Sequence, residues 1–108
     1  MRLFLVLLAA GNGKRLKTRT PKPFCKVNNM SILEHSLNNF KSFHEIKKTV
    51  IVYNKGHKKH IHKLSLKNTL KITGGRTRQE STFIALKKIK GMNCKKILIH
   101  DAARPNPS

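Results

Sequence analysis

Three short segments of this sequence combine residue types that could bind a phosphorylated ligand. The first segment, residues 8–15 (LAAGNGKR), places small residues next to two cations. Small residues let backbone N–H groups come close to a phosphate or a base, and the cations can meet negative charge. The segment is neither a dinucleotide fingerprint nor a P-loop, because Leu16 stands at the third glycine and Arg15 at the Ser or Thr. As a bare pattern, it is equally compatible with a plain turn after a strand.

Lys22 follows this segment and lies between Pro21 and Pro23. Proline fixes its own φ angle and restricts the residue before it, so the two rings stiffen this part of the chain. A lysine on such a backbone is better suited to a fixed role than one on a flexible loop tip. The alternative is an ordinary solvated lysine.

Two further segments follow predicted strands. Residues 74–81 (GGRTRQES) form a glycine turn that leads into a predicted helix, whose amino terminus presents free N–H groups to anions or carbonyl acceptors. Residues 100–105 (HDAARP) place Asp101 directly after a strand. Ligands of open α/β sheets bind at the carboxyl ends of strands, so Asp101 is a candidate ligand for a metal or a hydroxyl group. A simple turn or cap is the alternative for both segments.

Alternating strand and helix patterns surround these segments, which is typical of βαβ units with a mostly parallel sheet. The apolar run 3–9 predicts a central strand, and glycine and proline predict a long loop over 10–29. The rest of the pattern predicts strands at 49–53, 70–73 and 96–100, a helix starting at the capping box of Ser31, a weak helix at 56–66 and a helix at 79–90. We expect the strand order 3-2-1-4, which brings the ends of the first and fourth strands together.

The composition limits the class of protein. The chain has 108 residues, 24 of them Lys or Arg and 4 Asp or Glu, with a formal charge of +20. This length fits one compact unit, and no apolar run reaches the roughly 18–20 residues of a transmembrane helix. Cys25 and Cys94 form no C-x-x-C pair, so a reducing, cytoplasmic setting is expected. The charge attracts polyanions without identifying one.

Two other groupings are weaker candidates for chemistry. His57, His60 and His62 could hold a metal, but the lysines among them would repel a cation, so a solvated face is expected. Glu34 and Glu45 are interpreted as a helix cap and a surface residue. With four carboxylates in all, the chain is poorly supplied for paired-carboxylate hydrolysis.

In order and spacing, the segments at 9–15, 21–22, 74–81 and 100–105 resemble the 2-C-methyl-D-erythritol 4-phosphate cytidylyltransferase family of the non-mevalonate isoprenoid pathway. The resemblance spans the whole chain, and its most specific part is the HDAARP run. It implies an α/β, Rossmann-like nucleotidyltransferase fold with a mostly parallel sheet. The implied reaction joins CTP to 2-C-methyl-D-erythritol 4-phosphate, giving 4-diphosphocytidyl-2-C-methyl-D-erythritol and pyrophosphate with Mg²⁺ or another divalent cation.

The same resemblance implies roles for particular residues. Arg15 and Lys22 would be the catalytic cations, which meet the triphosphate and stabilise charge during phosphoryl transfer. Asp101 and Arg104 would bind the substrate and the ribose, and Asp101 would also be the metal ligand. The nucleotide would be bound by a set of mostly small residues, namely Ala9, Ala10, Gly11, Gly13, Gly75, Arg76, Ser81 and Ala102.

The sequence departs from the family at Leu8, Pro23 and Arg76, where the family usually has proline, glutamine and often an acidic residue. A backbone N–H contact at Arg76 would survive this change. The family runs to greater length, so residues 1–108 are expected to be the amino-terminal part of a single, apparently truncated nucleotidyltransferase domain. This part alone need not be a competent enzyme, and a homodimer is expected for the full-length protein.

Two alternative functions stay open. A related polyol- or sugar-phosphate nucleotidyltransferase is the nearest, and the HDAAR run favours methylerythritol phosphate over it. The other is a small basic module that binds RNA or DNA through its positive charge. Such a module predicts aromatic residues for base stacking, but the chain has only five Phe and one Tyr, most of them at core spacing.

Overall fold

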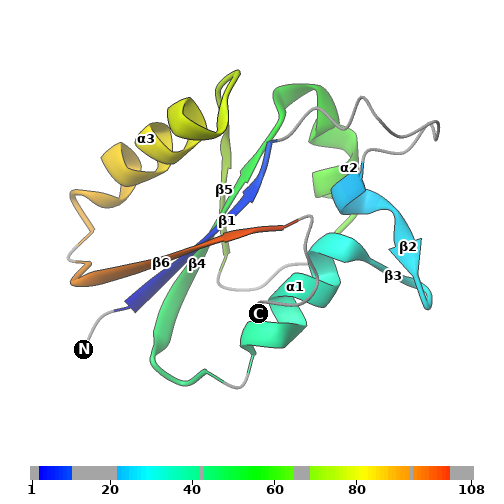
Figure 1. Cartoon of the computed structure of the whole chain (residues 1–108), viewed down its shortest axis with the longest axis horizontal. Helices are drawn as coiled ribbons and strands as arrows, with labels where there is room; N and C mark the ends of the chain where they lie inside the picture. The colour runs from blue at the N-terminus through cyan, green and yellow to red at the C-terminus, as the bar shows by residue number, and fades with distance from the viewer. Residues whose placement is uncertain (1–2, 11–21, 42, 65–68, 93, 103–108) are drawn as a thin grey trace.

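The computed structural model describes residues 3–10, 22–41, 43–64, 69–92 and 94–102. They form a parallel sheet with helices on both faces (Figure 1). The strands of this sheet are β1 (Leu3–Ala9), β4 (Ile46–Tyr53), β5 (Thr69–Thr73) and β6 (Lys96–Asp101), in the order β5-β4-β1-β6. Each neighbouring pair runs parallel. The predicted order 3-2-1-4 and the α/β fold are therefore confirmed.

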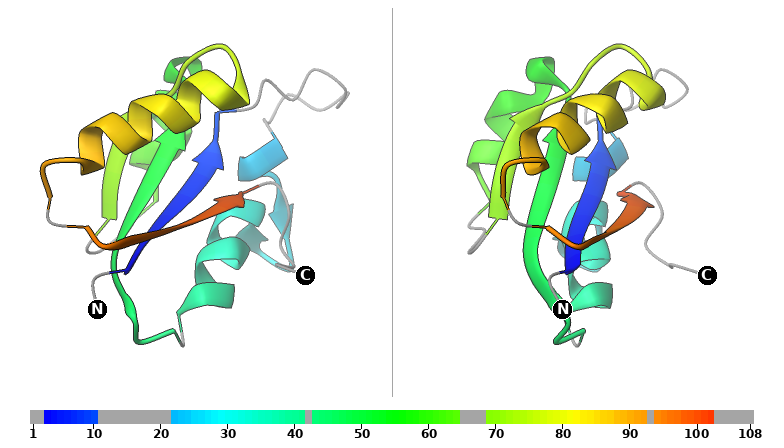
Figure 2. Two further views of the ribbon diagram at one scale, coloured as in Figure 1. Left: turned by 60° about the vertical axis from the view of Figure 1, so that its left-hand side comes forward. Right: turned by 90° about the vertical axis from the view of Figure 1, so that its left-hand side faces the viewer.

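The residues of β1 alternate between two buried faces. Leu5 and Leu7 lie in one core cluster with α1 (Ile32–Phe40) and α2 (Lys58–His62), and Val6 lies in the other cluster with α3 (Arg78–Ile89). Figure 2 shows α3 on one face of the sheet and α1 on the other. A strand covered on both faces must be apolar throughout, which explains the continuous apolar run.

Within the described part of the chain, no helix combines the length and apolar composition needed to cross a membrane.

The predicted long loop and the two residues after it contain short elements that the sequence pattern does not reveal. These are η1 (Lys22–Phe24), β2 (Lys26–Val27) and β3 (Met30–Ser31), and the two strands pair antiparallel. Between them, Asn28 and Asn29 have φ angles of 55° and 67°. A two-residue hairpin turn of type I′ has positive φ at both central positions, and asparagine tolerates it better than most residues. Strands of two residues are too short to produce a periodic pattern.

The helix boundaries follow the predicted capping signals. Ser31 Oγ accepts the Glu34 N–H at 3.1 Å, and Glu34 Oε1 accepts the Ser31 N–H at 3.1 Å, so the predicted capping box is confirmed. The weak helix is confirmed only in part, as η2 (Lys55–His57) followed by the short α2. The buried face of α3 consists of the regularly spaced Ser81, Ala85 and Ile89. The first two are small, which lets the helix lie close to the sheet.

Gly74 lies where the ends of β1 and β4 meet the beginning of α3. A methyl group added to Gly74 would lie 2.6 Å from Ser81 Oγ, 2.7 Å from Ala10 Cβ and 2.8 Å from Val52 Cγ1. These distances are well inside van der Waals contact, so a larger residue would force the three segments apart. The Gly74 N–H also donates to the Tyr53 carbonyl at 2.7 Å. The turn after β5 is therefore packed directly against the neighbouring strands.

Phe24 attaches η1 to the rest of the fold. Its buried ring stacks on His60, with the ring centroids 5.0 Å apart, and meets His57 edge-on at 5.9 Å. His57 and His60 are therefore partly buried, and the predicted solvated face is correct only for His62.

No group of three or more His, Cys, Asp or Glu among the described residues could hold a metal ion. Burial, and to a lesser extent the neighbouring His60, lower the pKa of His57 below its ordinary value.

We expect Gly74→Ala to lower the free energy of unfolding by about 1–3 kcal/mol, the usual cost of overpacking. Gly91→Ala is the matched control, because a methyl group there meets nothing within 4 Å. The control should stay within about 0.5 kcal/mol of the original protein. Urea denaturation followed by circular dichroism measures both variants. Equal stability of the two variants would show that the junction at Gly74 accommodates a methyl group without overpacking.

We expect the free energy of unfolding to fall as the pH is lowered from about 7 to 5.5. The folded state has the lower His57 pKa, so below the ordinary histidine value the unfolded chain binds more protons. Stability present at neutral pH is therefore lost on acidification. Urea midpoints at both pH values measure this slope, and His57→Asn should reduce it. A slope that the substitution leaves unchanged would contradict the assignment to His57.

Candidate active site

The carboxyl ends of the parallel strands lie at one edge of the sheet, and the three predicted segments follow these ends. In the register of the sheet, Leu8 lies opposite Asp101 and Ala9 lies opposite Tyr53. The Ala102 N–H donates to the Leu8 carbonyl at 2.9 Å. Open α/β sheets bind their ligands at this edge. The described parts of the segments are thus brought together, although they are far apart in the sequence.

Ala9 and Ala10 carry the first segment into this edge. Ala9 is buried in a core cluster that also contains Phe24 and Ala102. Ala10 is partly buried and lies against Gly74. Their small side chains let the neighbouring turn come close to the end of β1. The remaining predicted residues of this segment, Gly11, Gly13 and Arg15, lie outside the described residues.

Lys22 begins η1, and the packing of Phe24 determines where this short helix lies. Because Phe24 shares its core cluster with Ala9 and Ala102, η1 lies close to the ends of β1 and β6. The structure describes the backbone of Lys22 but not its side chain. The catalytic role of Lys22 therefore stays a prediction.

Two residues in the first turn of α3 hold the glycine turn. Ser81 is buried, and its Oγ accepts the Gly75 N–H at 3.0 Å. Glu80 Oε1 accepts the Arg76 N–H at 3.3 Å, and Thr77 Oγ1 accepts the Glu80 N–H at 3.0 Å. Glu80 is absent from the predicted site residues, although Thr77 and Glu80 have the spacing of a capping box. The backbone donors expected to meet a base are thus engaged within the turn.

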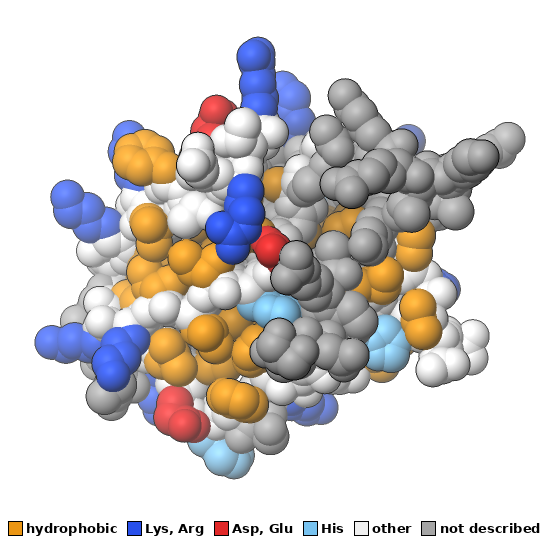
Figure 3. All heavy atoms as spheres, viewed as in Figure 1, with side chains coloured by type: hydrophobic (Ala, Val, Ile, Leu, Met, Phe, Trp, Pro, Cys, Tyr) orange, Lys and Arg blue, Asp and Glu red, His pale blue; other side chains and the backbone are white. Residues whose placement is uncertain are grey.

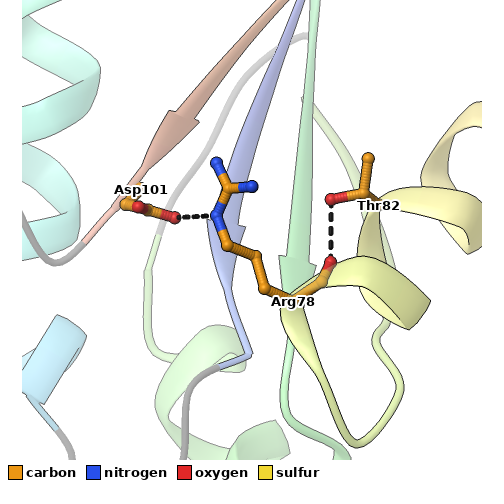
Figure 4. A network of polar contacts seen from close by, with 3 residues as sticks. All are labelled: Arg78, Thr82 and Asp101. Atoms are coloured by element: carbon orange, nitrogen blue, oxygen red, sulfur yellow. Dashed lines mark hydrogen bonds and ion pairs between the residues drawn. The ribbon is translucent and has the colours of Figure 1, made fainter.

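Asp101 ends β6 and forms an ion pair with Arg78, the first residue of α3 (Figure 4). The Arg78 Nε donates to Asp101 Oδ1 at 3.1 Å, and the two side chains are 61% and 36% exposed. Arg78 belongs to a predicted segment, but the sequence assigns it no role, because a contact between residues 23 positions apart produces no local pattern. Arg104 lies outside the described residues. The carboxylate therefore lies at the surface, with one of its oxygens held by a cation.

Helix α1 holds the segment that follows β6. Ala102 is completely buried, and its carbonyl accepts a hydrogen bond from Ser36 Oγ at 3.2 Å. Ser36 is itself completely buried, and a polar residue at a core position of α1 is the signal that could have identified it. The backbone after Asp101 is thus fixed on two sides, by β1 through the Ala102 N–H and by α1 through the Ala102 carbonyl.

Other surface features of the described residues are less suited to a nucleotide. A cavity of about 480 Å³ lies against α1 and the amino-terminal half of the sheet, and its lining includes Leu5, Leu37 and Phe40. Its carboxylate, Glu34, is engaged in the helix cap. Most of the Lys and Arg side chains visible in Figure 3 lie around the rim of the face, and one lies near its centre beside a carboxylate. The edge that carries Asp101 is therefore the strongest candidate for the site.

Comparison with known proteins shows which family shares these segments. The sequence matches the family described as IspD: 2-C-methyl-D-erythritol 4-phosphate cytidylyltransferase over residues 3–107. It is 48% identical over 101 residues to the bifunctional enzyme IspD/IspF of Pelagibacter ubique, with 94% of this chain and 27% of that protein covered. It is 36% identical over 106 residues to the 2-C-methyl-D-erythritol 4-phosphate cytidylyltransferase of Clostridium botulinum, with 94% of this chain and 46% of that protein covered.

Solved structures agree with the sequence match. The 4-diphosphocytidyl-2C-methyl-D-erythritol synthase of Anaerococcus prevotii has a TM-score of 0.77 at 25% identity, over 95% of this chain and 44% of that one. The bifunctional IspDF of Campylobacter jejuni has a TM-score of 0.78 at 30% identity, over 94% of this chain and 26% of that one. The chain spans about half the length of the Clostridium relative. Because the family match covers nearly all of the sequence, the chain belongs to the IspD, or 2-C-methyl-D-erythritol 4-phosphate cytidylyltransferase, family.

Proposed function

We propose that this chain binds CTP at the carboxyl edge of its sheet and is part of an enzyme that transfers the cytidylyl group to 2-C-methyl-D-erythritol 4-phosphate. The products would be 4-diphosphocytidyl-2-C-methyl-D-erythritol and pyrophosphate. One observation supports the proposal above all: Gly74 lies against both Ala10 and Ser81, while Asp101 pairs with Arg78 from the same helix turn as Ser81. Three segments typical of the family thus meet at one edge. Residues 1–108 would form one part of a single nucleotidyltransferase domain.

In this proposal, the backbone of the two glycine-containing segments binds the nucleotide. Ala9, Ala10, Gly11, Gly13 and Ala102 would surround the sugar and phosphates, where small residues permit close approach. Gly75, Arg76 and Ser81 would line the base pocket. Because the Gly75 and Arg76 N–H groups already donate to Ser81 and Glu80, a base that uses them must share or replace these acceptors. Ser81 would then serve the pocket chiefly by shaping the turn.

The chemistry assigned to the site is phosphoryl transfer. An oxygen of the substrate phosphate would attack the α-phosphorus of CTP, and the bond from that phosphorus to pyrophosphate would break. Such reactions depend on positioning and on stabilising the charge that grows on the phosphate oxygens. Arg15 and Lys22 would stabilise that charge, and Arg104 would bind the anionic substrate.

The homodimer and the cytoplasmic setting expected from the sequence belong to this proposal as well.

A divalent cation, expected to be Mg²⁺, completes the proposal. Mg²⁺ in nucleotide-binding enzymes is commonly held by one or two carboxylates together with substrate phosphates and water. Asp101 is a hard oxygen ligand at the proposed edge, and one carboxylate is enough if the triphosphate supplies most other ligands. The cation, when bound, would neutralise phosphate charge.

The nucleic-acid-binding alternative is less well supported. Most of the aromatic residues are buried, as their core spacing predicts, namely Phe4, Phe24, Phe40 and Tyr53. Phe43 and Phe83 are exposed but lie on separate elements of the fold. Neither arrangement offers the row of stacking platforms that single-stranded nucleic acids use.

We expect the full-length protein to bind CTP with Mg²⁺ more tightly than ATP or GTP, because the glycine turn would contact the edge of the base. Isothermal titration calorimetry with the three nucleotides under identical conditions measures this preference. Equal affinity for all three would remove the cytidine assignment and leave the fold unaffected.

We expect Arg15→Ala or Lys22→Ala to lower the turnover of the full-length enzyme by a factor on the order of 10², as the loss of one preorganised electrostatic group commonly does. Lys58→Ala removes the same charge from an exposed position on α2 and should leave turnover unchanged. Steady-state release of pyrophosphate measures all three variants. Equal small losses at the three positions would mean that overall basicity, rather than placement, matters.

A further inference from the structure

The ion pair between Arg78 and Asp101 joins two segments that the proposed function assigns to different parts of the nucleotide. Arg78 follows the glycine turn of the base pocket, whereas Asp101 ends the strand beside β1. Figure 4 shows the arginine side chain reaching from the start of α3 to the carboxylate at the end of β6. The contact therefore couples the two halves of the proposed site.

The backbone of Arg78 is well fixed, so its side chain starts from a defined place. Thr77 caps α3 by accepting the Glu80 N–H, and Thr82 Oγ1 donates to the Arg78 carbonyl at 2.8 Å. Ser81, in the same turn of the helix, is buried against Gly74. The guanidinium group is thus presented from a rigid part of the edge and not from a loop.

The ion pair contributes little to the fold itself. Both side chains are substantially exposed, at 61% and 36%, and exposed ion pairs add little to the free energy of unfolding. Two of the other three carboxylates accept backbone N–H groups: Glu34 does so at the start of α1, and Glu80 does so in the glycine turn. Asp101 instead contacts a side-chain cation, although a carboxylate at the end of a strand needs no such partner. The main effect of Arg78 is therefore on the carboxylate.

We propose that Arg78 is a positioning residue, whose Nε–H holds Oδ1 of Asp101 so that the second carboxylate oxygen accepts a hydroxyl group of the bound nucleotide sugar. The inference rests on the proposed function and narrows the two roles considered for Asp101. A guanidinium group beside the carboxylate disfavours a second cation there and leaves a neutral donor as the better partner. The divalent cation is then held chiefly by the triphosphate. Arginine suits this task because its planar guanidinium keeps a fixed direction for its donors.

The test is a double-mutant cycle on CTP affinity in the full chain, measured by calorimetry with excess Mg²⁺. Arg78→Ala is expected to weaken CTP binding about tenfold, the loss of one well-aligned, charge-assisted hydrogen bond. In the Asp101→Asn background, Arg78→Ala should cause no further loss, because Arg78 acts through Asp101. The nucleotide 2′,3′-dideoxy-CTP lacks the sugar hydroxyls. The Arg78→Ala variant and the original protein should therefore bind 2′,3′-dideoxy-CTP with equal affinity.

Lys88→Ala is the matched control, since it removes one positive charge from an exposed position near the other end of α3. It should retain the original CTP affinity, and its urea midpoint should equal that of Arg78→Ala. Losses that add in the double variant, or that persist with dideoxy-CTP, would overturn the positioning role. So would a CTP affinity of Arg78→Ala equal to that of Lys88→Ala. An original protein that binds no CTP would refute the proposed function itself, and with it this inference.

Discussion

The parallel pairing of β1 with β4 on one side and β6 on the other is the constraint on which the rest of this structure depends. It buries both faces of β1, so polar groups of this strand can lie only at its ends. Because the strands are parallel, their carboxyl ends share one edge. That edge collects Ala10, Gly74 and Asp101 from the beginning, middle and end of the sequence. Close packing there requires small residues, which also leave backbone groups accessible to a ligand.

The distribution of charge fits the same edge. The chain has 24 Lys and Arg residues but only 4 Asp and Glu residues, and three of these carboxylates have defined partners. Glu34 caps α1, Glu80 holds the glycine turn, and Asp101 contacts Arg78. Most of the cations visible in Figure 3 lie around the rim of the face. A strongly anionic ligand would thus be attracted by the whole molecule, while its orientation would depend on a few groups at the edge.

The sequence predicts those features that have a local signal. The alternation of strands and helices predicts a parallel sheet, and the usual order of such sheets supplies the strand order. The start of α1 follows from the spacing of Ser31 and Glu34. The β2–β3 hairpin is too short for a periodic pattern. The stacking of Phe24 on His60 and the ion pair of Arg78 with Asp101 depend on how distant segments pack, which no local pattern records. Residue types and strand ends indicate the three segments, Lys22 and Asp101, and the family resemblance supplies the roles of the site residues. The groups that hold the glycine turn and Asp101 are evident only in the structure.

We propose that the nucleotide binds where β1, β4, β5 and β6 end. Backbone amide NMR of the isotopically labelled full chain, titrated with CTP and Mg²⁺, tests this claim most directly. We expect the largest shift changes at Ala10, Gly75, Ser81 and Ala102, and little change at the opposite end of the strands. Changes centred on Leu37 and Phe43 in the cavity beside α1, or on the lysines of α2, would contradict it.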